Sequence, residues 1–168
     1  IFAVIIAYSF IIGRENTVKI IIGSYIAILA ADGVGNLFKQ YALGSEQFVL
    51  FLKFFGFGQE DKTIILFKVV VFIVAIVILA IKGGFDVHVG IGHGGIIGII
   101  SNLIFGFLSA GLVISTLLIY VSGASFVTGN LSIVNTTLAA AYQESEMVKL
   151  MIDNYNLWFA LPALTFVV

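Results

Sequence analysis

Two charged side chains, Asp32 and Lys68, stand deep inside otherwise apolar segments. An ionised group in hydrocarbon is costly, so such residues tend to pair with each other or to serve an ion or proton pathway. If one segment runs inward from Thr17 and the next returns from Thr63, a rise of about 1.5 Å per residue places the two charges at comparable depth. The sequence therefore predicts a buried pair with a possible transport role. The alternative is local: Lys68 reaches the headgroups and Asp32 caps a frayed helix end.

A second group of chemically capable side chains lies in a glycine-rich linker between two apolar runs. Asp86, His88 and His93 carry carboxylate and imidazole groups, which are zinc ligands. They are crowded together without a distant fourth ligand, so a solvated polar turn is favoured over a metal site. We expect neither a metal nor another cofactor.

The glycines between positions 90 and 98 do not indicate nucleotide binding. Neither a G-x-x-x-x-G-K-[ST] string nor a G-x-G-x-x-G following a strand is present. No nucleophile elbow, His-Glu-x-x-His or paired-carboxylate arrangement occurs. The chain has no cysteine, which excludes disulfides, thiolate metal sites and cysteine nucleophiles. The sequence thus predicts a protein that is not an enzyme.

Composition sets the class of protein. Hydrophobic residues make up 61% of the chain and charged residues 10%, with a mean hydropathy of +1.18, whereas soluble domains contain about 25% charged residues. The net charge of −1 and the lack of a basic block argue against nucleic acid as a partner. We therefore predict an all-α integral membrane protein whose first partner is the lipid bilayer.

About four transmembrane helices are expected, each needing about 20 residues. The first apolar run ends at Ile12 and is too short to cross, so it is expected to be the end of a span that begins before Ile1. A polar turn, 13–16, leads into a second span over 17–38. The third span covers 63–81, and the fourth reaches about Tyr120.

Other segments are expected outside the hydrocarbon. The Phe-rich stretch between 39 and 62 is too short to span and predicts an interfacial or re-entrant helix. A polar loop is expected over 122–138 and an amphipathic helix over 139–154. In the apolar tail, Trp158 and Tyr155 suit the membrane interface or the start of another span. The chain thus divides into a transmembrane bundle, 1–121, and a region of loop, helix and tail, 122–168.

Small residues recur at every fourth position in two expected spans, which places them on one face of each helix. Such strips let helix backbones approach closely, and internal packing is commoner than homodimerisation. We predict that the two strips pack against each other at the centre of the bundle. They comprise Gly23, Ala27, Ala31 and Gly35 in the second span, and Gly94, Gly98, Asn102, Gly106 and Ala110 in the fourth.

The order of these features resembles the colicin V production protein family. The shared features are a Gly13-Arg14 turn, a second helix rich in small residues, a uniformly apolar third helix, and the glycine-containing stretch 104–111. The resemblance covers roughly residues 5–125. It implies a multipass protein of the bacterial inner membrane, linked to colicin export and envelope maintenance, without catalytic residues. It also implies a cytoplasmic position for 13–19 and 82–93, whereas the Lys and Arg distribution favours the opposite orientation.

Three functions remain open at this point. The leading expectation is a non-enzymatic membrane scaffold or accessory subunit, acting through helix contacts with itself or with another membrane protein. A channel or transporter subunit for ions or protons, using Asp32 and Lys68, is the alternative from a different class. A structural membrane protein of a virus or of a large complex would have the same composition.

Overall fold

The computed structural model is helical wherever it describes a regular element. The described residues are 1–41, 45–47, 50, 54, 60–82, 95–124 and 136–166. Three helices in this part of the chain are long and apolar enough to cross a membrane: α2 (Arg14–Tyr41), α4 (Glu60–Lys82) and α5 (Ile96–Ser122). The helix before them, α1 (Phe2–Ile12), has 11 residues, short of the about 20 that a span needs. The expected all-α membrane class is confirmed, but the expected count of four spans is not.

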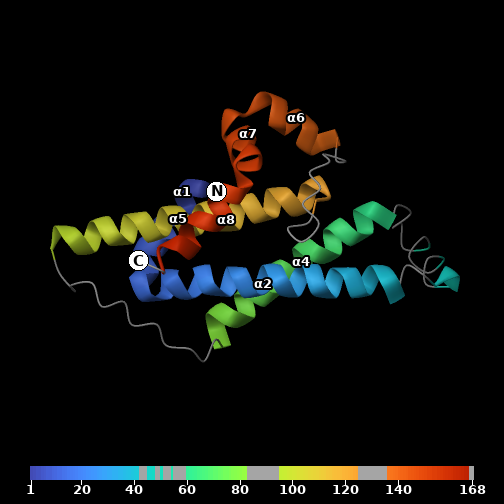
Figure 1. Cartoon of the computed structure of the whole chain (residues 1–168), viewed down its shortest axis with the longest axis horizontal. Helices are drawn as coiled ribbons and strands as arrows, with labels where there is room; N and C mark the ends of the chain where they lie inside the picture. The colour runs from blue at the N-terminus through green and yellow to red at the C-terminus, as the bar shows by residue number, and fades with distance from the viewer. Residues whose placement is uncertain are drawn as a thin grey trace.

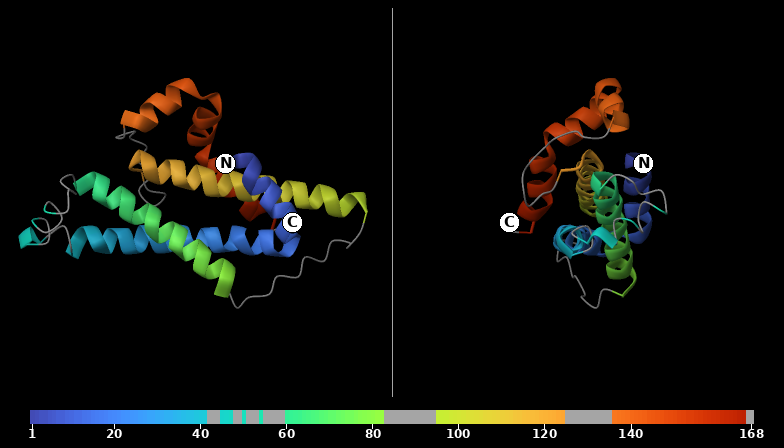
Figure 2. Two further views of the ribbon diagram at one scale, coloured as in Figure 1. Left: turned by 180° about the vertical axis from the view of Figure 1, so that it is seen from behind. Right: turned by 90° about the vertical axis from the view of Figure 1, so that its right-hand side faces the viewer.

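The long helices form a bundle with α5 at its centre (Figure 1). α2 packs along α4, and α5 contacts both of them as well as α1 and α8 (Tyr155–Leu164). The end-on view in Figure 2 shows α1 and α8 on either side of α5. Within the apolar window of each helix, 61% of residues are buried in α5 but only 11% in α4. Of these three helices, α5 is therefore the most buried and α4 the most exposed.

Helical periodicity explains which side chains form the core. The buried positions of α2 recur every three or four residues, which places them on one face of the helix. Val18, Ile21 and Ile28 from this face pack with Phe72 of α4 and Leu112 of α5. In contrast to these buried residues, the β-branched side chains on the outer face of α4 are about half exposed: Val70, Ile73, Val74, Val77 and Ile78.

The turn between α1 and α2 is tighter than the four-residue polar link expected from the sequence. α1 ends at Ile12 and α2 begins at Arg14, so Gly13 alone makes the turn. Its φ of +80° lies in the region that favours glycine. The hydroxyl of Thr17 donates to the carbonyl of Gly13 at 2.9 Å and contacts that of Ser9 at 3.3 Å. Both helix ends are thereby held at one point.

The amphipathic helix expected over 139–154 is two helices, so the expectation of one continuous helix is wrong. α6 (Thr136–Glu144) and α7 (Glu146–Asp153) are separated by Ser145, whose backbone is extended and whose hydroxyl accepts from the N–H of Val148. A serine at this position caps α7 and so favours a new helix start over continuation. The Tyr142 hydroxyl donates to the Asp153 carboxylate at 2.6 Å, which joins α6 to α7 and raises the pKa of Tyr142.

Trp158, for which the sequence favours the membrane interface or the start of another span, is buried against a neighbouring helix. Its side chain is 5% exposed and lies against Gly111 of α5. A Cβ atom at position 111 would overlap the indole ring, so only glycine leaves the space that docks α8 on α5. The Phe-rich stretch between 39 and 62 and the loop over 122–138 fall largely outside the described residues.

Replacing Gly111 by alanine should therefore displace Trp158 and loosen α8. Overpacking of this kind costs about 1–3 kcal/mol. Trp158 is the only tryptophan in the chain, so its fluorescence reports the change: we expect a red-shifted emission, easier quenching by a water-soluble quencher, and a lower unfolding temperature in detergent.

Gly33→Ala is the matched control, because Gly33 is an exposed helical glycine and a Cβ atom there would meet nothing within 4 Å. It should leave the Trp158 emission unchanged. Equal emission and equal stability in the Gly111 and Gly33 variants would show that α8 does not depend on this contact.

Candidate functional site

Asp32 and Lys68 meet between α2 and α4. The Lys68 Nζ donates to the Asp32 Oδ1 at 2.8 Å. Lys68 is 7% exposed and Asp32 is 1% exposed. Asp32 lies roughly 27 Å along α2 from Arg14, and Lys68 lies roughly 12 Å along α4 from Glu60, at 1.5 Å per residue. The pairing expected from their matched depth is confirmed.

Both local alternatives for these residues are wrong. α2 continues past Asp32 to Tyr41, so Asp32 does not cap a frayed helix end. The Lys68 ammonium group is buried on Asp32 rather than extended toward the headgroups. The physical reason is that an ion pair inside the bundle lowers the cost of both charges at once.

Gly35 makes room for the lysine. A Cβ atom there would lie 2.7 Å from both Cγ and Cε of Lys68, closer than real side chains approach. The stem of Lys68 therefore crosses α2 where α2 has no side chain. Farther along the same contact, the rings of Phe38 and Phe67 stack with their centroids 4.2 Å apart. The α2–α4 contact is thus polar at Asp32 and apolar on both sides of it.

The second carboxylate oxygen of Asp32 does not take part in the ion pair. The Oδ2 atom of Asp32 is buried and has no hydrogen-bond partner among the described residues. Tyr120 of α5 lies nearby: its hydroxyl donates to the carbonyl of Ile28, one turn before Asp32, at 3.1 Å. The Oδ2 atom can thus accept one more hydrogen bond, for which a water molecule is a suitable donor.

Two tyrosines that the sequence analysis did not single out join the helices near this pair. Tyr120 is 1% exposed and also packs edge-on against Phe72, with ring centroids 5.7 Å apart. The hydroxyl of Tyr25, in α2, donates to the carbonyl of Phe159 in α8. A phenol within an apolar span needs a partner for its hydroxyl, and that signal was present in the sequence.

The strip of small residues on α2 faces α4. A Cβ atom at Gly23 would touch the Leu79 side chain at 3.5 Å, and one at Gly35 would meet Lys68. The two alanines between these glycines, Ala27 and Ala31, are fully buried. The expected packing of this strip against the strip on α5 is therefore wrong at both glycines.

The strip on α5 has a different neighbour. A Cβ atom at Gly106 would lie 3.1 Å from the Cβ of Ser9, so α1 occupies this face of α5. Ala110 is buried, whereas Gly98 and Asn102 are only half-buried. Gly94 lies outside the described residues. Among the described residues of this strip, Gly106 and Ala110 are the ones buried within the protein.

The candidate metal ligands Asp86, His88 and His93 lie outside the described residues. Within the parts of the chain that the structure does describe, no group of three or more His, Asp or Glu residues could hold a metal ion.

The comparisons with known proteins add no relative: no protein-family model, curated protein or solved structure matches the chain.

The ion pair gives a testable expectation for stability. Lys68→Met leaves the Asp32 carboxylate buried without its partner, and Asp32→Asn leaves the ammonium group without its partner. Each change should cost about 3–5 kcal/mol. The double variant removes both charges and should cost clearly less than the sum, as measured by unfolding in detergent.

Lys62→Met is the control, because Lys62 is an exposed lysine on the same helix. It should change stability little, since exposed charges contribute about 0–1 kcal/mol. Strictly additive losses in the double variant would show that Asp32 and Lys68 are not coupled.

Proposed function

We propose that the chain is a non-enzymatic multipass membrane scaffold or accessory subunit, of the colicin V production type. The supporting observation is the 2.8 Å contact of Lys68 with Asp32, which uses the two deepest charges of the spans to hold α2 against α4. Charges used in this way stabilise an arrangement of helices, which is what a scaffold requires. A place in the bacterial inner membrane and a part in export or envelope maintenance belong to the same proposal.

The first turns of α5 are the surface that suits a membrane-protein partner. Ile96, Ile97 and Ile99 are 63–76% exposed, and α5 extends beyond the start of α2 in Figure 1. Asn102 stands in this apolar part of the helix, half-buried, and its amide makes no hydrogen bond with the described residues. An amide in a membrane helix favours association because a second helix can offer it a partner.

Replacing Asn102 by leucine should therefore weaken assembly while the fold is kept. We expect a several-fold loss of the associated form, measured as particle mass in mild detergent and as crosslinking in vesicles. Ile78→Leu is the control, because Ile78 is 53% exposed on α4, outside this surface; it should leave the assembly intact.

The scaffold proposal is contradicted by a wild-type chain that stays monomeric in detergent and in vesicles and holds no stoichiometric membrane protein. An assembly that Asn102→Leu does not change would instead show that Asn102 takes no part in the contact.

An ion or proton pathway is the second candidate, and the unpartnered Oδ2 of Asp32 is the observation that favours it. A carboxylate oxygen buried in a span is a place where a proton or cation could reside. The scaffold proposal expects proteoliposomes with the wild-type chain to show no more ion or proton flux than protein-free vesicles. A flux that Asp32→Asn abolishes would favour the pathway, and a flux that survives this change would exclude Asp32 from it.

A further inference from the structure

The Asp32–Lys68 pair has more hydrogen-bonding capacity than the described residues use. An ammonium group has three N–H donors, and the Lys68 Nζ directs one of them to the Asp32 Oδ1 at 2.8 Å. Its other two N–H groups make no hydrogen bond with the described residues, and neither does the Asp32 Oδ2. Both side chains are more than nine-tenths buried. Donors and an acceptor are therefore left without partners at one buried point.

The phenol of Tyr120 brings a third polar group to this point, from α5. Its hydroxyl donates to the carbonyl of Ile28 at 3.1 Å, and in an α-helix this carbonyl also accepts the N–H of Asp32, four residues on. The Tyr120 ring packs against Phe72, one turn after Lys68 on α4. A phenol oxygen that donates its proton can still accept a hydrogen bond. Each of α2, α4 and α5 thus contributes one polar side chain here.

The charges of the pair favour a small neutral ligand. A metal cation at the Asp32 Oδ2 would be repelled by the adjacent Lys68 ammonium group, and an anion at the ammonium group would be repelled by the carboxylate. A water molecule both donates and accepts hydrogen bonds. One molecule can therefore accept from the Lys68 Nζ and donate to the Asp32 Oδ2 and to the Tyr120 oxygen, and about three hydrogen bonds are typical of a buried water molecule.

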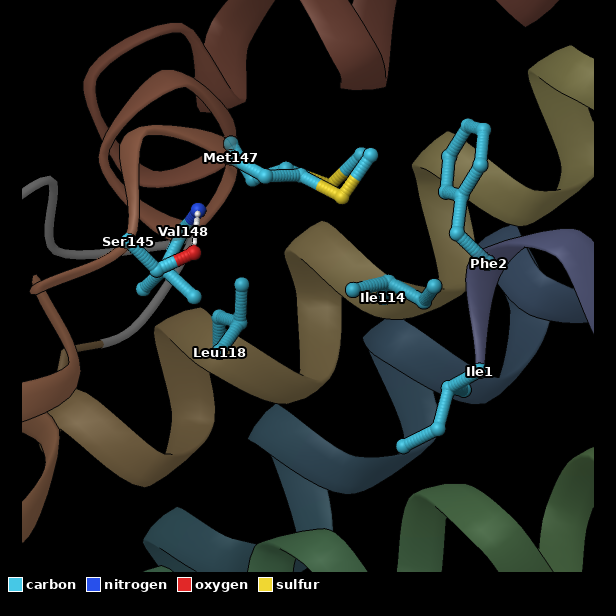
Figure 3. Close-up of a pocket in the computed structure, with 8 residues that line it drawn as sticks. Ile1, Phe2, Ile114, Leu118, Ser145, Met147 and Val148 are labelled. Carbon is cyan, nitrogen blue, oxygen red and sulfur yellow. Dashed lines mark hydrogen bonds between the residues drawn. The ribbon is translucent and has the colours of Figure 1, made fainter.

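The pocket of about 260 Å³ between α5 and α7 lacks such groups (Figure 3). Among the described residues that line it, Ser145 alone is polar, and its hydroxyl already accepts the N–H of Val148. A water molecule would find no unmet partner there, whereas the ion pair offers several. Unmet polar groups, and not open volume, distinguish the ion pair as a water site.

We propose that one internal water molecule is bound between Asp32, Lys68 and Tyr120 and joins α2, α4 and α5. The water supplies the partners that these buried groups lack, which would otherwise be costly, and it connects α5 directly to the ion pair. The proposal does not rest on the scaffold role. The water can be bound in a chain that never assembles, and the helices can assemble around a dry pair.

X-ray radiolysis followed by mass spectrometry tests this proposal, because an irradiated internal water molecule yields a hydroxyl radical that modifies the side chains around it. Tyr120 is 1% exposed and Ile21, a core residue of α2, is 0% exposed, so exposure alone predicts that neither is modified. After correction for the reactivities of the free amino acids, we expect Tyr120 to be modified several-fold faster than Ile21 in the wild-type chain.

Asp32→Leu combined with Lys68→Met replaces both charged groups by apolar ones of similar size, and it should lower the Tyr120 modification several-fold. Ser24→Ala is the matched control, because it removes another buried polar group of α2 whose hydroxyl already donates to the carbonyl of Ile20 at 2.7 Å. It should leave the Tyr120 modification unchanged. Unfolding temperature and Trp158 emission show that each variant is folded, and the wild-type comparison depends on no variant.

The proposal is overturned if Tyr120 is modified no faster than Ile21, or if the apolar double variant keeps the full modification. It is also overturned if replacing Na⁺ and K⁺ by choline at constant ionic strength lowers the unfolding temperature of the wild-type chain but not of the double variant, because the ligand would then be a metal cation. A labelled chain that fails to assemble would contradict the scaffold proposal alone.

Discussion

Hydrocarbon offers no hydrogen-bond partner, and the rest of this structure follows from that constraint. Several polar side chains within the spans form hydrogen bonds with other helices or with their own backbone. Lys68 donates to Asp32, and the hydroxyl of Tyr120 reaches the carbonyl of Ile28. Thr116 donates to the carbonyl one turn earlier in its own helix. The contacts of α2 with α4 and with α5 are therefore each fixed at a polar point, and apolar packing fills the space around it.

Glycines determine where these contacts occur. Gly35 leaves space for the stem of Lys68, Gly106 for Ser9, and Gly111 for the ring of Trp158. These neighbours belong to α4, α1 and α8. Glycine spacing in this chain thus encodes several contacts with different helices, and one of these glycines, Gly35, gives the lysine of the ion pair its space.

Much of the architecture was predictable from patterns within single segments. The length of the apolar runs predicted α2, α4 and α5. The similar depth of the two charges in their spans predicted the pairing of Asp32 with Lys68. The prediction of one amphipathic helix over 139–154 was wrong, because Ser145 caps a new helix there. The buried position of Trp158 was not predictable, because it depends on Gly111, far away in the sequence.

The sequence by itself determined the class of the protein, the faces of its helices and the two charges that must meet. Composition and helical periodicity are properties of each segment alone, so they can be read without the fold. Tertiary structure alone decided which helix each face meets: α4 for the strip on α2, and α1 for the strip on α5. A four-residue repeat places small residues on one side of a helix, but the choice of partner depends on side chains of helices distant in the chain.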